Sequence, residues 1–133
     1  MLSHERLSYS RRMFSEAVLH HFRNPRNAGE LPDAHATVEV INPVCGDVLK
    51  LSARLVDGRI AEARFLCRGC TTAIACASLL TETLRGKSVS EISAISPDEI
   101  SSALGGLPQA TFHAAQLAAD GAAALKNSLT SRK

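Results

Sequence analysis

The residues best suited to chemistry in this chain are three cysteines and an aspartate, gathered in two short segments. Cys45 and Asp47 lie two residues apart in the segment 42–47, and Cys67 and Cys70 form a Cys-x-x-Cys pair further along. Thiolates and carboxylates are ligands of soft or borderline metals such as zinc and iron. Together the two segments predict an exposed metal site that holds iron or zinc.

The segment around Cys45 has two interpretations. Gly46 allows the chain to bend so that the Cys45 and Asp47 side chains face one point, as two metal ligands would. A loop cysteine followed by an Asx-type turn has the same sequence without any metal. The segment alone leaves both interpretations open.

The Cys67 and Cys70 pair is typical of a metal site or a redox pair. Cys70 lies where a helix is predicted to begin, so the helix dipole and free N–H groups favour its thiolate. Cys67 continues the inward row of a predicted strand, so a small core residue is as good an interpretation as a ligand. The preceding strands predict a meander rather than a βαβ unit, which disfavours a thioredoxin-like role.

The last cysteine and the histidines are weaker candidates. Cys76 lies about 240° around a helix from Cys70, so we expect a buried structural residue. His113 lies near the start of the last predicted helix, and a lone histidine is more often structural than a ligand. The other histidines match no pattern and are expected at the surface: His4, His20, His21 and His35.

The composition favours a soluble cytoplasmic protein. The chain has 133 residues, 45% of them hydrophobic but only 4% aromatic, and a net charge of +2. A balanced charge and few aromatic residues disfavour nucleic-acid binding. No apolar run has the length of a membrane span, and the N-terminus lacks a signal-peptide core. We expect a flexible leader over 1–9 and a single domain over 10–130, with reduced cysteines.

Three strands are predicted in the middle of the chain. Apolar and polar residues alternate over 38–41, 49–55 and 60–67, and Asp57-Gly58 is a tight-turn signal. The strands therefore form an antiparallel meander, with the first cysteine segment between two strands and the Cys-x-x-Cys pair at its end. The last strand is expected to turn these residues to one face: Ala61, Ala63, Phe65 and Cys67.

In the sequence, helices are predicted before and after this meander. The first helix is expected to begin at the cap Ser10 and to end at the Asn24-Pro25 turn. The later helices are expected over 71–84, around 90–92, from the cap Ser96, and from Pro108 to about Asn127. The fold class is therefore α+β, a three-stranded antiparallel sheet packed with helices on one face.

In this order of segments the chain resembles a known family, the U-type iron–sulfur cluster assembly scaffolds. The family comprises IscU, SufU and the N-terminal domain of NifU. The resemblance covers about residues 13–127 and is carried by these segments: 21–29 (HFRNPRNAG), 43–51 (PVCGDVLKL), matches within 63–82, 86–88 (GKS) and matches within 107–120. It implies an IscU-like fold, in agreement with the meander and helices.

The resemblance also implies a site. The family uses three cysteines, an aspartate, and a histidine that directly precedes the third cysteine. Four positions of this chain match that pattern: Cys45, Asp47, Cys70 and His113.

Two positions depart from the family pattern. At the position of the family's third cysteine this chain has Ala114. The resemblance implies that this cysteine receives persulfide sulfur. We expect Cys67 to supply the missing thiolate. The segment 107–111 reads Leu-Pro-Gln-Ala-Thr where the IscU branch has Leu-Pro-Pro-Val-Lys. Docking of an Hsp70-type chaperone, which that branch segment performs, is therefore not expected.

The function implied by the resemblance is a non-enzymatic scaffold. It would bind iron, build a transient cluster, expected to be [2Fe–2S], and pass it to apo iron–sulfur proteins. A cysteine desulfurase would be a partner, and the chain would be a monomer or weak homo-oligomer without membrane or nucleic-acid partners. The alternatives are a zinc-binding sulfur acceptor for the desulfurase and a structural metal-binding protein.

Overall fold

The computed structural model describes residues 14–131. The predicted leader 1–9 and the predicted cap Ser10 lie outside this range. Residues 14 and 15 are not helical, and the first described helix is capped by Ser15, whose Oγ accepts from the Val18 N–H. The elements in chain order are α2 (Glu16–Arg23), β1 (Ala36–Ile41), β2 (Val48–Val56), β3 (Arg59–Arg68), α3 (Thr71–Leu84), α4 (Val89–Ile92), α5 (Pro97–Ala103), a 3-10 helix (Gln109–Thr111) and α6 (Phe112–Thr130).

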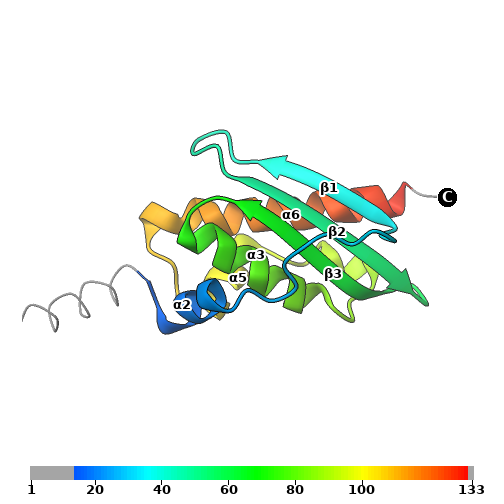
Figure 1. Ribbon diagram of the computed structural model, residues 1–133, viewed down its shortest axis with the longest axis horizontal. Coiled ribbons are helices and arrows are strands. Elements are labelled where there is room, and N and C mark those ends of the chain that lie inside the picture. The colour runs from blue at the N-terminus through cyan, green and yellow to red at the C-terminus, as the bar shows by residue number, and fades with distance from the viewer. Residues whose placement is uncertain (1–13, 132–133) are drawn as a thin grey trace, which may run out of the picture.

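The three strands form one antiparallel sheet in the order β1-β2-β3. Leu51 stands opposite Val38 on one side and Phe65 on the other, and Leu51 and Phe65 are buried. The helices lie behind this face of the sheet (Figure 1). The α+β fold expected from the sequence is therefore confirmed.

Small side chains allow the two long helices to pack closely on the sheet. α6 contacts β1 and β2, while α3 contacts β3. Alanines are buried along both helices, among them Ala75, Ala77, Ala115, Ala118 and Ala122. No helix within residues 14–131 is both long and apolar enough to cross a membrane.

The predicted facing of Ala61 is wrong, because β3 contains a β-bulge. Arg54 pairs with Glu62 while Leu55 pairs with Ile60, so Ala61 is an extra residue. Because one inserted residue reverses the facing of the chain beyond it, Ile60 and not Ala61 is buried there. The rest of the predicted row, from Ala63 onward, does face the helices.

The segment between α2 and β1 crosses the outer face of the sheet like a strap (Figure 1). We call residues 24–35 the strap. Near its start, the Gly29 N–H donates to the Phe65 carbonyl at 2.8 Å, and the Phe65 N–H donates to the Asn27 carbonyl at 3.0 Å. Near its end, the His35 N–H donates to the Ala53 carbonyl at 2.8 Å. The strap therefore pairs with the exposed edge of β3 before it reaches β1.

His21 is buried, contrary to its predicted place at the surface. Its Nδ1 lies 2.8 Å from Ser78 Oγ, which itself accepts from the Arg26 N–H at 2.7 Å. The Ser78 hydroxyl proton is thus available to a neutral His21 ring, whose Nε2 lies 3.6 Å from Glu82. Burial lowers the pKa of His21, and Glu82 offsets this only in part. Histidine counts as a polar residue when apolar residues are sought at helical spacing. The sequence pattern therefore did not predict that His21 is buried between α2 and α3.

Stability is expected to fall as the pH drops below the ordinary histidine pKa of about 6.5. The folded chain holds His21 with a lowered pKa, so the unfolded chain binds the proton more tightly and protonation favours unfolding. Urea unfolding at about pH 7.5 and pH 5.5 measures this difference. His21→Gln should reduce it strongly, whereas His20→Gln should reduce it only slightly, because His20 is a smaller cause of the lowered pKa than burial. Equal pH dependence in the parent and His21→Gln would show that another group is responsible.

Candidate metal centre

The loop between β1 and β2 is closed by main-chain hydrogen bonds. The Asn42 N–H donates to the Asp47 carbonyl, and the Gly46 N–H donates to the Asn42 carbonyl, both at 2.8 Å. Gly46 has φ of +76°, a left-handed conformation that glycine adopts without strain. The bend expected from the sequence therefore occurs at Gly46 and turns the chain between Cys45 and Asp47.

The Asn42 side chain positions the loop, a role the sequence analysis did not assign. Its Oδ1 accepts from the Val44 N–H at 2.8 Å and from the Cys45 N–H at 3.4 Å. Its Nδ2 donates to the His113 carbonyl at 3.4 Å, which ties the loop to the start of α6. The signal for this role is the Asn-Pro-Val-Cys order, because asparagine commonly accepts from the main chain two residues on.

Three of the predicted ligands converge on one point. One ligand atom from each of Cys45, Asp47 and His113 lies within 4.8 Å of the other two. Cys45 is exposed and the other two are half-buried. Ligand atoms about 2.0–2.3 Å from a single ion are roughly 3.5 Å apart, so a small adjustment of these side chains would enclose a metal.

One oxygen of the Asp47 carboxylate has no hydrogen-bond partner among the described residues. This oxygen is Oδ2, which is buried. Leaving such an oxygen unpaired costs about 1–3 kcal/mol or more. The carboxylate also lies against Gly69, where an added Cβ would stand 2.8 Å from Asp47 Cγ. An unpaired carboxylate oxygen beside a thiol and an imidazole fits a bound cation.

Cys70 lies at the start of α3, next to Gly69. Its Sγ accepts from the Ala73 N–H at 3.4 Å, so it caps the helix as the sequence predicted. The side chain is exposed. Cys70 is therefore accessible, although it lies outside the group of three described above.

Cys67 is half-buried and packs against the core. Burial, with smaller contributions from Asp47 and Cys70, raises the pKa of its thiol to about 12. Both interpretations from the sequence thus stay open, because a metal that displaces the proton would still recruit this sulfur. Cys76 is fully buried and burial raises its pKa to about 12, which agrees with its predicted structural role.

Gly69→Ala is expected to weaken zinc binding at least about tenfold, because the new Cβ displaces the Asp47 carboxylate. Zinc affinity measured by competition with a chromophoric chelator tests this. The matched control is the same change in an Asp47→Ala background, where no carboxylate remains to be displaced and no further loss is expected. A tenfold loss in both backgrounds would locate the effect elsewhere in the loop.

The comparisons with known proteins show the family and the fold of the chain. The family model described as the NifU-like N-terminal domain matches residues 13–132. In the solved N-terminal structure of a nitrogen-fixing NifU-like protein from Brucella abortus, the fold is similar with a TM-score of 0.74. That likeness has 16% sequence identity and covers 92% of this chain and 98% of the other. At this identity it shows the fold alone.

Two curated relatives are similar in sequence. Iron-sulfur cluster assembly scaffold protein IscU 1 of Archaeoglobus fulgidus is 44% identical over 108 residues, which cover 81% of this chain and 71% of that protein. Iron-sulfur cluster assembly scaffold protein IscU of Escherichia coli K12 is 42% identical over 111 residues, which cover 80% and 86%. The chain is similar to these two IscU scaffold proteins along most of its length, and it belongs to the NifU-like N-terminal domain family.

Proposed function

We propose that this protein is an iron–sulfur cluster assembly scaffold, which binds iron, builds a transient cluster and passes it to apo-proteins. The observation that carries the proposal is the convergence of Cys45, Asp47 and His113 at the end of the sheet. The names of the curated relatives support it. The cluster is cargo in this account, and the protein acts as its carrier rather than as an enzyme.

The ligand types suit a cluster that must leave again. Thiolates hold iron in iron–sulfur clusters, whereas the Asp47 carboxylate is a harder ligand that binds the same iron less firmly. Cys45 and Cys70 are exposed, so an acceptor protein can approach their sulfurs. Exposure and mixed ligation together favour transfer over storage.

The proposed ligand set is Cys45, Asp47, Cys70 and His113, completed by Cys67 as the third thiolate. Ala114, at the position after His113, is buried and offers no donor atom. Cys67 is the proposed alternative source of sulfur, because its thiol is close enough to Asp47 and Cys70 for their charges to raise its pKa. We expect a [2Fe–2S] cluster, with zinc as an alternative occupant of the purified protein.

The proposed partners are those that the resemblance to the scaffold family implies. A cysteine desulfurase would supply sulfur, and apo iron–sulfur proteins would receive the cluster. We propose a cytoplasmic protein that is a monomer or a weak homo-oligomer. An Hsp70-type chaperone is not among the proposed partners, because the segment 107–111 departs from the chaperone-docking pattern.

Anaerobic reconstitution with iron and sulfide tests the proposed function. The parent protein should develop the visible absorbance of a cluster, with matching iron and sulfide contents. Cys45→Ser should lose most of it, and Cys76→Ala, a buried cysteine outside the centre, should retain it. A protein that binds only zinc and stimulates a cysteine desulfurase would instead be a sulfur acceptor. A protein that binds zinc but does not stimulate the desulfurase would hold the zinc as a structural metal.

A further inference from the structure

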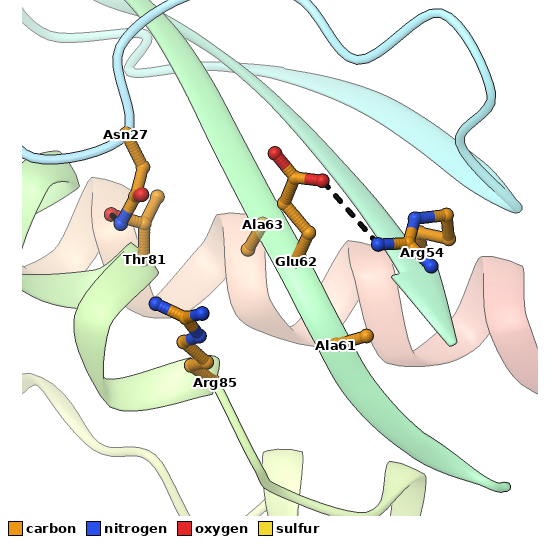
Figure 2. Close-up of a pocket in the computed structure, with 7 residues that line it drawn as sticks. All are labelled: Asn27, Arg54, Ala61, Glu62, Ala63, Thr81 and Arg85. Atoms are coloured by element: carbon orange, nitrogen blue, oxygen red, sulfur yellow. Dashed lines mark hydrogen bonds and ion pairs between the residues drawn. The ribbon is translucent and has the colours of Figure 1, made fainter. Parts of the chain in front are cut away.

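The two edges of the sheet differ in how they are covered. At the edge of β3 the strap pairs with Phe65, and residues 86–87 pair with the far end of the strand. Between them, Asn27 of the strap and Thr81 of α3 lie beside β3 (Figure 2), joined by a hydrogen bond of 3.1 Å from Asn27 Nδ2 to Thr81 Oγ1. Ala63, in this stretch of the strand, is 3% exposed. The edge of β3 is therefore covered over most of its length.

The edge of β1 has main-chain groups that point away from the sheet. Because Phe65 bonds to the strap, its partner Leu51 bonds to Val38 of β1 instead of to β3. At the end of the same ladder the Asn42 N–H donates to the Asp47 carbonyl, as this alternation requires. The residues of β1 between these bonding positions direct their N–H and C=O groups outward: Thr37, Glu39 and Ile41.

These three outward residues are open to solvent. All three are exposed, Ile41 to 60%. No group within residues 14–131 forms a hydrogen bond with their N–H or C=O groups. β1 pairs with β2 in one unbroken register and contains no proline or lysine, two residue types that protect natural edges from pairing. The edge of β1 is therefore an accessible template for a further strand.

The core-facing side of β1 is also incompletely covered. Val38 and Val40 pack toward the core but remain half-buried, whereas Leu51 and Leu49 opposite them are 0% and 1% exposed. The helices therefore cover the middle of the sheet better than its flank at β1. Apolar side chains of an added strand would remove Val38 and Val40 further from water, which is favourable.

The edge of β1 leads directly to the metal centre. β1 ends at Ile41, and Asn42 begins the loop that carries Cys45. In that loop Val44 is 90% exposed, so apolar surface continues from the end of β1 into the loop. Exposed apolar side chains beside a functional site favour a protein partner there. A strand paired with Ile41 would run next to the loop that holds Cys45.

Glu39 sets the charge of the segment that fits this edge. It is the one charged residue of β1 and is exposed, and its carboxylate forms no hydrogen bond or ion pair with the described residues. Opposite charges on facing residues stabilise a strand pair, whereas like charges destabilise it. An antiparallel pair of two β1 strands would bring two Glu39 carboxylates together near its centre. A segment with a lysine or arginine therefore fits better than a second copy of this chain.

We propose that the outer edge of β1 binds an extended segment of a cluster-accepting protein by β-strand addition, with a basic residue of that segment opposite Glu39. The segment would run antiparallel to β1, so that its N-terminal end lies beside the Cys45 loop. Its binding to the edge stands on the geometry of β1, whereas the identity of the partner rests on the proposed scaffold function.

A solvated edge is the competing explanation. Natural edge strands often carry a charge that prevents pairing with any other chain, and Glu39 would then have only that role. In that case no extended peptide would bind, whatever its charge. The experiment below distinguishes the two roles.

The test is a nuclear magnetic resonance titration of the full chain with the peptide acetyl-Thr-Val-Lys-Val-Thr-amide. The amide signals of Thr37, Glu39 and Ile41 should shift on binding. The same peptide with glutamate in place of lysine should bind about fivefold more weakly, and Glu39→Lys should reverse that preference.

Two modified peptides test strand pairing itself. N-methylation of the lysine removes the N–H that faces β1 and should abolish binding. N-methylation of the second valine removes an N–H that faces away from β1 and should leave binding in place. Glu39→Pro, which removes an outward N–H and none from the ladder with β2, should lose the peptide and still assemble a cluster like the parent.

Other outcomes overturn the proposal. Absence of binding, equal binding of the lysine and glutamate peptides, or binding of the peptide methylated at lysine would each contradict it. Edge signals that shift with protein concentration alone would show a second copy of this chain as the occupant. The lysine peptide in excess should slow cluster transfer to an apo-ferredoxin, and unchanged transfer would contradict the assigned partner. Peptide binding needs no cluster, so a parent protein that bound the peptide but assembled no cluster would contradict the scaffold function and leave the edge site standing.

Discussion

Cys67→Ser is expected to abolish most cluster formation during anaerobic reconstitution. In the proposed centre the only thiolates available are Cys45, Cys70 and Cys67, because Ala114 stands at the family's third cysteine position. Loss of one of three thiolates should leave too few sulfur ligands to hold the cluster, since serine is a poor ligand for iron. Visible absorbance and the iron content of the desalted protein measure the loss.

Two further variants separate ligation from packing at Cys67. Ala114→Cys in the Cys67→Ser background should restore cluster formation, because it returns a thiolate to the centre from α6. Cys67→Ala with normal cluster formation would contradict the ligand role, as would a Cys67→Ser protein that assembles a normal cluster. Cys67 would then be a core residue, and His113 with Asp47 would complete the site.

Asp47→Ala is expected to make a reconstituted cluster persist several-fold longer rather than decay faster. The carboxylate is the weaker ligand in the proposed set, and its removal leaves the thiolates and the imidazole to hold the iron. Thermal stability should be unchanged or slightly higher, because the buried Oδ2 accepts no hydrogen bond from the described residues. The decay of visible absorbance in a chelator and the melting temperature, measured on the same preparation, test both statements.

The alternative role for Asp47 is structural, as the last residue of the turn begun at Asn42. The variant would then lose about 1 kcal/mol of stability, as for other side chains that cap turns. Faster cluster loss with unchanged melting would contradict the proposed lability.

Most of the fold could be predicted because local signals agree with the tertiary structure. α3 was expected over 71–84 and occupies Thr71–Leu84, since its apolar residues suit a helix buried between the sheet and its neighbours. The cap at Ser96, followed by Pro97, likewise marks the start of α5 as predicted. Signals of this kind depend on neighbouring residues and are visible in the sequence.

Features that depend on distant residues were not predictable. The bulge at Ala61 depends on the register with Arg54 and Leu55 across the hairpin. The burial of His21 depends on Ser78, which is 57 residues away. The link from Asn42 to His113 spans 71 residues. These contacts have no periodic signature, because their partners meet only after the helices pack on the sheet.

Of the candidate site, too, the local features could be predicted from the sequence and the long-range contacts could not. The spacing of Cys45, Gly46 and Asp47 predicts a bend with two side chains on one side, and the structure has that bend. The approach of the Asp47 carboxylate to Gly69 joins the two cysteine segments through a residue without a side chain. No property of glycine in the sequence distinguishes this close approach from an ordinary turn.

Transfer of a cluster tests the central claim most directly. The reconstituted protein is mixed anaerobically with an apo-ferredoxin and a chelator that captures free iron, and the ferredoxin spectrum is followed. The account predicts that holo-ferredoxin forms in the chelator's presence, and that it forms more slowly from Asp47→Ala. Cluster that stays on this protein, or iron that reaches only the chelator, would contradict the scaffold function.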